Sequence, residues 1–233
     1  MSASQPDPAE PTSSPRSDGP QSNGHAAAGG DRPSPQPDAE AVGSGEPAAS
    51  NTFAGDVDAE ATASAAPRYA SAESLMSQGR HAEAAEIYSA ALAADPDDVP
   101  ALLGLASTML ARGQYDAAER ELRRALRLAP GMGGLHYHLG LTLYKRGVYP
   151  AAAAELRRGL ELEPASAPAH LLLGEALNQM GEPDAAIEAL EKAVHLEPGN
   201  GKAYYALGIA YDRKGRPDRA TEMYRRSREL GRR

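Results

Sequence analysis

The sequence repeats itself every 34 residues from about residue 65 onwards, and this periodicity constrains the fold more than any single residue does. Three residue types recur in register through successive periods. They are Gly79, Gly113, Gly147, Gly181 and Gly215; Pro96, Pro130, Pro164 and Pro198; and Ala84, Ala118, Ala152, Ala186 and Ala220. A repeat of this length predicts a stack of similar small units, not a globular domain built around one active site.

Each period predicts two helices. The first should end near the glycine row, because glycine closes a helix in the left-handed conformation without a Cβ penalty. The second should end at the proline row, because proline cannot continue a helix. Apolar residues such as Leu143 and Leu156 recur at helical spacing, which predicts faces packed on neighbouring helices.

Small residues recur at positions where helices should cross closely. Gly140, Gly174 and Gly208 share one such offset in three successive periods. Glycine inside a helix costs about 0.5–1 kcal/mol relative to alanine. Its recurrence therefore predicts a crossing at which a larger side chain would push the helices apart.

The pattern is fullest in the stretch that begins Ala203-Tyr204-Tyr205-Ala206-Leu207-Gly208 and continues through Tyr211, Gly215, Ala220 and Tyr224. It resembles the tetratricopeptide repeat (TPR) family. The resemblance implies an all-α fold, an α-solenoid wound as a right-handed superhelix of about five 34-residue helix-turn-helix repeats. The implied repeats span residues 65–98, 99–132, 133–166, 167–200 and 201–233. Members of the family bind many unrelated partners, so the resemblance implies the fold more strongly than the function.

Residues 1–64, called here the N-terminal segment, have a different composition. They are rich in Pro, Ser, Gly and Ala, and they carry ten acidic and two basic side chains. Such a segment cannot bury enough apolar surface to offset its ordering entropy, so it is predicted to be disordered. It is interpreted either as a solubilising spacer or as a regulatory tail with Phe53 as an anchor.

The other end of the chain has the opposite charge. Residues 212–233 carry nine basic and four acidic side chains. A solvated face on the last helix explains this pattern, and a weak contact with the chain's own acidic N-terminal segment is a second interpretation. Nucleic acid is not expected as a partner, because the repeats carry 22 acidic and 22 basic residues and no basic patch interleaved with stacking aromatics.

No catalytic chemistry is predicted. The chain has no cysteine, which excludes disulfides, thiolate metal sites and a cysteine nucleophile. We find no nucleophile elbow, phosphate-binding glycine loop or histidine pair at metal-ligand spacing. We therefore expect no enzyme, no cofactor and no metal. The sequence shows neither a secretory signal nor about 18 consecutive apolar residues, so we expect a cytoplasmic protein without a membrane span.

The resemblance to the TPR family implies that the first helix of each repeat lines a concave groove. The offsets that would face this groove are rich in apolar and aromatic residues, which suit recognition of a peptide or an amphipathic helix. The candidates for partner binding are Leu103, Leu110, Tyr137, His138, Leu141, Tyr144, Leu171, Leu172, Asn178, Tyr205 and Ile209. Some of these residues could equally pack against neighbouring helices.

Two functions remain open from the sequence. The first is a non-catalytic scaffold or adaptor that binds a partner peptide or helix in the groove. The alternative is a structural subunit of a larger assembly that docks through the basic C-terminal helix. The identity of the partner does not follow from the sequence in either case.

Overall fold

The computed structural model describes residues 69–232, so the disorder predicted for residues 1–64 lies outside the described part. Residues 69–77 are helical. The helices that follow are α2 (His81–Ala94), α3 (Val99–Ala111), α4 (Tyr115–Leu128), α5 (Gly133–Lys145), α6 (Tyr149–Leu162), α7 (Ala167–Met180), α8 (Pro183–Leu196), α9 (Gly201–Arg213) and α10 (Pro217–Leu230). Between residues 69 and 232 no strand occurs, and the predicted all-α class is confirmed. None of these helices is both long and apolar enough to cross a bilayer.

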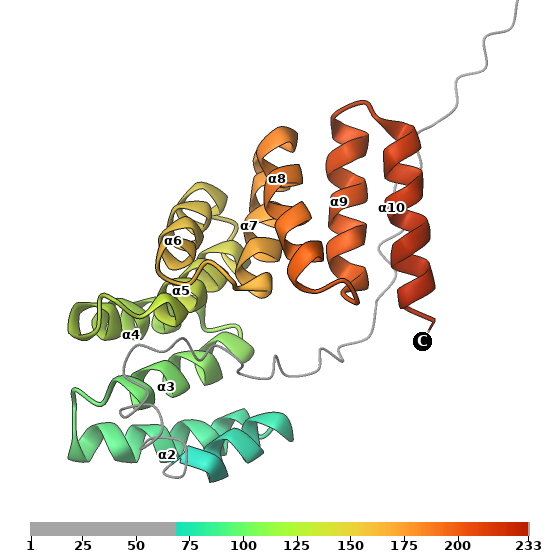
Figure 1. Ribbon diagram of the computed structural model, residues 1–233. Coiled ribbons are helices and arrows are strands. Elements are labelled where there is room, and N and C mark those ends of the chain that lie inside the picture. Colours follow the sequence, from blue (N-terminus) through green and yellow to red (C-terminus); the bar gives the residue numbers. More distant parts are fainter. Residues whose placement is uncertain (1–68, 233) are drawn as a thin grey trace, which may run out of the picture. The chain divides into compact units, whose positions relative to one another are not determined.

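The helices form an α-solenoid in which each labelled helix packs against the next one along the chain (Figure 1). The first helices of successive repeats also touch one another, in the pairs α3–α5, α5–α7 and α7–α9. The second helices of this stack, α2, α4, α6, α8 and α10, do not touch one another. The first helices therefore lie on the inner side of the stack.

The first helix of each repeat ends at the glycine row, as predicted. The five glycines have φ between 72° and 80°, in the left-handed region. In the first repeat the amide of Arg80 donates to the carbonyl of Leu75 at 2.8 Å, and the amide of Gly79 donates to the carbonyl of Met76 at 3.0 Å. These bonds form a Schellman motif, which satisfies carbonyl groups at the helix end.

The second helices from α2 to α8 end two residues before a proline. The residue directly before the proline has left the helical conformation, with φ of −133° at Asp95 and −132° at Glu163, because proline disfavours a helical residue before it. In three repeats a side chain caps the N-terminus of the first helix, namely of α3, α7 and α9. The side chains of Asp98, Ser166 and Asn200 each accept a hydrogen bond from the backbone amide three residues later.

Helix α5 begins without a capping side chain of its own, since its N-cap residue is Met132. The carboxylate of Glu163, at the end of α6, accepts a hydrogen bond from the amide of Gly134 at 3.2 Å. Burial raises the pKa of the Glu163 carboxyl and outweighs the bonds from the amides of Gly134 and Gly133, which lower it. The cap of α5 is thus supplied by the second helix of the same repeat.

Small residues lie where the two helices of one repeat cross, as predicted. A Cβ atom added to Gly140, Gly174 or Gly208 would lie less than 3.0 Å from a side chain of the second helix. At Gly174 the distance to Cγ of Leu190 would be 2.3 Å, and Leu190 is fully buried. The close packing of Leu190 therefore leaves no room for a larger side chain at Gly174.

Candidate binding surface

The inner face of the stack brings most of the predicted partner-binding residues to helices that touch one another. Six of them are partly exposed: Leu103, Leu110, Tyr137, Leu141, Tyr144 and Ile209. Tyr205 is 53% exposed. These residues come from α3, α5 and α9, and they are available for contact with another molecule.

Three of the predicted residues are buried, which differs from the expectation that they face an open groove. Leu171 and Leu172 are 8% and 6% exposed, and both belong to the hydrophobic core around α7. Asn178 is 4% exposed, and its Nδ2 donates a hydrogen bond to the carbonyl of Ala206 at 3.0 Å. The bond from Asn178 joins α7 to α9, and Leu171 and Leu172 pack into the core instead of facing an open groove.

His138 is the remaining residue that was predicted to bind a partner. It shares its offset with Gly104, where an added Cβ would lie 2.2 Å from the ring of Tyr88 on the preceding repeat's second helix. This offset therefore turns towards the preceding repeat, and His138 is only partly exposed. Desolvation by burial lowers the pKa of His138 to about 4, so its imidazole is neutral at physiological pH.

Helix α5 carries three of the partly exposed candidate residues. Tyr137, Leu141 and Tyr144 follow one another at spacings of four and three residues, so they share one face of the helix. All three pack their inner parts against the hydrophobic core while remaining partly exposed. Burial raises the pKa of the Tyr144 hydroxyl, and the nearby Glu175 carboxylate adds to this effect.

Sequence profiles described as tetratricopeptide repeat match residues 75–131, 137–200 and 177–232. The chain belongs to the tetratricopeptide repeat family. The family resemblance inferred from the 34-residue pattern is thereby confirmed. No curated protein matches the sequence.

The TPR array is similar to several solved structures. The crystal structure of MamA is 31% identical over 69% of this chain and 94% of that chain, with a TM-score of 0.62. The structure of MamA from residue 41 to its end, from Desulfovibrio magneticus RS-1, is 27% identical over 72% and 95%, with a TM-score of 0.64. The crystal structure of YrrB, a TPR protein with an unusual peptide-binding site, is 27% identical over 71% and 86%, with a TM-score of 0.59.

Polar contacts border the apolar part of the TPR array's inner face. Nζ of Lys202 on α9 lies 3.6 Å from Oε1 of Glu175 on α7, whose side chain is 16% exposed. The sequence did not predict this ion pair, because the two residues are 27 positions apart and no spacing within a helix links them. Among residues 69–232, no group of three or more His, Asp and Glu side chains is placed to share a metal ion.

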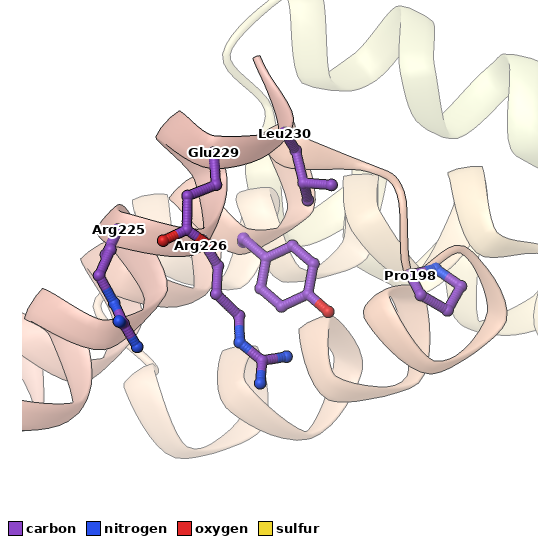
Figure 2. Close-up of a pocket in the computed structure, with 6 residues that line it drawn as sticks. Pro198, Arg225, Arg226, Glu229 and Leu230 are labelled. Atoms are coloured by element: carbon purple, nitrogen blue, oxygen red, sulfur yellow. The ribbon is translucent and has the colours of Figure 1, made fainter. Parts of the chain in front are cut away.

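Two hollows involve residues of the last TPR repeat. The first is lined by Pro198, Tyr204, Arg225, Arg226, Glu229 and Leu230. Figure 2 shows Arg225, Arg226 and Glu229 extending from one helix, with Pro198 on the other side of the hollow. The guanidinium carbon of Arg226 lies 5.7 Å from the centre of the Tyr204 ring, within the range of a cation–π contact.

The second hollow was missed by the sequence reasoning. It lies on α9 and α10 and is lined by Tyr205, Thr221, Tyr224, Ser227 and Arg228. Of these residues only Tyr205 had been predicted to bind a partner. A signal was present, because the tyrosine pair found here recurs at the same offsets in the first repeat.

Proposed function

We propose that this TPR protein is a non-catalytic scaffold that binds a segment of a partner protein along the inner face of the array, chiefly on α5. The observation that carries the proposal is the row formed by Tyr137, Leu141 and Tyr144. Neighbouring apolar side chains that stay partly exposed on one helix face form a contiguous patch, and such patches mark interaction sites. Tyrosine combines an apolar ring with a polar hydroxyl. Its ring can therefore be buried in an interface while its hydroxyl forms a hydrogen bond.

The surroundings of this row indicate what kind of segment it fits. The row provides apolar contacts at helical spacing, so it suits a partner with two or three apolar anchors on an extended strand or an amphipathic helix. Lys202 and Glu175 supply charges beside it for polar groups of the partner. The peptide-binding site named for YrrB supports this use of the fold. The cytoplasmic location of the protein stays a prediction.

The absence of catalysis is part of the same proposal. Stacked repeats create extended surfaces, and proteins built this way use them for binding. The partly exposed candidates on α5 are a leucine and two tyrosines, and burial raises the pKa of the Tyr144 hydroxyl, so it stays protonated at neutral pH. These groups favour recognition over acid–base chemistry.

Site-specific photo-crosslinking in the cell of origin tests the proposal. A photoreactive amino acid at Leu141 should capture one protein in good yield, and a photoreactive group at Arg157 should not. Arg157 is an exposed residue of α6, on the second helix of the same repeat, so it controls for random collisions. Equal capture from both positions, or capture from Arg157 alone, would refute binding on the α5 face.

A further inference from the structure

The first and last repeats carry the same pair of tyrosines. Tyr69 and Tyr88 in the first repeat stand at the offsets of Tyr205 and Tyr224 in the last. The ring centroids lie 5.2 Å apart in the first pair, with planes inclined at 46°. In the last pair the values are 5.5 Å and 50°. The two ends of the array therefore hold matching aromatic surfaces, and the first shows how such a surface is covered.

Helix α3 covers the first pair. Tyr69 and Tyr88 are 4% and 3% exposed. The hydroxyl of Tyr69 donates to Oδ2 of Asp98, the N-cap residue of α3, at 2.7 Å. Gly104, six residues later, lies against the Tyr88 ring, since an added Cβ would be 2.2 Å from it. The cover is thus a helix with a carboxylate at its start and a glycine where it crosses the ring.

The last pair is uncovered among the described residues. Tyr205 is 53% exposed, Tyr224 is partly exposed, and both line the hollow on α9 and α10, whose volume is about 390 Å³. The hydroxyl of Tyr224 donates to Oδ2 of Asp212 at 2.7 Å, which fixes the ring in place. Gly208 makes room for the ring from within the repeat, because its added Cβ would lie 2.4 Å from Cε1.

The charge of this end differs from that of the first repeat. Arg228 stands at the offset of Leu92. Leu92 packs against the core cluster of the first repeat, and Ala101 and Leu105 of α3 belong to that cluster. Arg228 is exposed, and residues 212–233 carry nine basic and four acidic side chains. A helix covering the last pair would bring its N-terminal turn, which carries a partial positive charge, near this arginine. Acidic residues in that turn would compensate both positive charges.

We propose that the surface formed by Tyr205, Thr221, Tyr224, Ser227 and Arg228, called here the end surface, binds a helix of a partner protein. The chemistry of α3 and of Arg228 specifies this helix. It starts with Asp or Glu, carries further acidic residues in its first turn, and has glycine or alanine about six residues after its start. The carboxylates at the start of this helix accept a hydrogen bond from the Tyr205 hydroxyl and form an ion pair with Arg228. The small residue lies where the helix crosses the ring of Tyr224. This surface is separate from the α5 face, so neither proposal depends on the other.

A synthetic peptide provides the probe. It copies residues 96–112 of this chain, which contain α3, with Val99 and Pro100 replaced by glutamate to make the first turn acidic. Titrated into the full chain labelled with ¹⁵N, it should give saturable chemical-shift changes confined to α9 and α10. A peptide with leucine in place of Gly104 should bind at least tenfold more weakly.

Three protein variants make the test specific. Tyr205→Ala and Arg228→Glu both change exposed side chains, and each should weaken binding at least fivefold. A peptide with lysines at the two glutamate positions should bind the Arg228→Glu variant better than it binds the unchanged chain. Tyr137→Ala, on the α5 face, should leave the affinity for the original peptide unchanged.

Other outcomes would overturn the inference. Shift changes centred on α5, or an affinity insensitive to Tyr205→Ala and Arg228→Glu, would show that the end surface is not the site. Absence of saturable shifts at millimolar peptide would show that it does not take such a helix. Binding that occurs only after residues 1–64 are deleted would show that the chain's own N-terminal segment is the occupant, and not an external partner.

Discussion

Helices α5 and α7 present the same offsets to the inner face and use them differently. On α5 these offsets carry Tyr137, Leu141 and Tyr144, which are partly exposed. On α7 they carry Leu171, Glu175 and Asn178, which are buried or paired with α9. Helix α7 contacts α9 more extensively than α5 contacts α7. The neighbouring repeat therefore decides whether a position of the repeat joins two units or remains accessible to a partner.

Removal of the same side-chain atoms from α5 and from α7 should have unequal effects on stability. Leu171→Ala should reduce the free energy of unfolding by about 2–4 kcal/mol, because the side chain is buried and leaves a cavity. Leu141→Ala should cost less than half as much, since part of its side chain is already in water. Urea unfolding followed by circular dichroism measures both. Equal losses would mean that α5 is as fully packed as α7.

The stability of the folded protein should depend on pH through His138 on α5. Its pKa is lowered to about 4 in the folded protein, against about 6.5 in the unfolded chain. The unfolded state therefore binds more protons between these values, and stability falls as pH decreases from about 6.5 to 4. The loss is at most about 3 kcal/mol, and less because the side chain is partly exposed.

Leucine stands at this offset in the fourth repeat, as Leu172, so His138→Leu is the matched control. The variant should show a flatter dependence of the urea midpoint on pH between 6.5 and 4. An unchanged dependence would show that other groups cause it and that His138 is open to solvent.

The smallest effect concerns the charged ends. Deletion of residues 1–60 removes the acidic N-terminal segment, and exposed ion pairs contribute about 0–1 kcal/mol each. The full chain should therefore bind an acidic probe such as polyglutamate a few-fold more weakly than the deletion variant at low salt. The difference should vanish at high salt, where charges are screened. Identical binding by fluorescence anisotropy at both ionic strengths would show that the N-terminal segment is only a spacer.

Much of the fold followed from the sequence because its determinants are local. Gly181 closes a helix through its own backbone conformation, and Pro164 ends one through its ring, so each acts the same way wherever the repeat places it. The glycine at position 174 was predicted to serve packing, and the contact with Leu190 confirms that reason.

The candidate surface followed only in part, because exposure depends on neighbours that a single offset does not encode. Tyr144 and Asn178 share an offset, yet the first stays accessible and the second bonds to the backbone of α9. The ion pair between Glu175 and Lys202 joins two repeats and has no within-helix spacing to reveal it. The 34-residue register shows that Tyr205 and Tyr224 repeat the pair formed by Tyr69 and Tyr88. Only the structure shows that α3 covers the first pair.

The affinity of the partner captured at Leu141 for variants of α5 tests the central claim most directly. Tyr137→Ala combined with Tyr144→Ala should weaken binding by about 2 kcal/mol or more, roughly 30-fold, if these rings are hot spots. Arg157→Ala combined with Arg158→Ala, on exposed positions of α6, should leave the affinity unchanged. An affinity unchanged by the tyrosine substitutions, with the fold intact by circular dichroism, would contradict the assignment of α5 as the recognition helix.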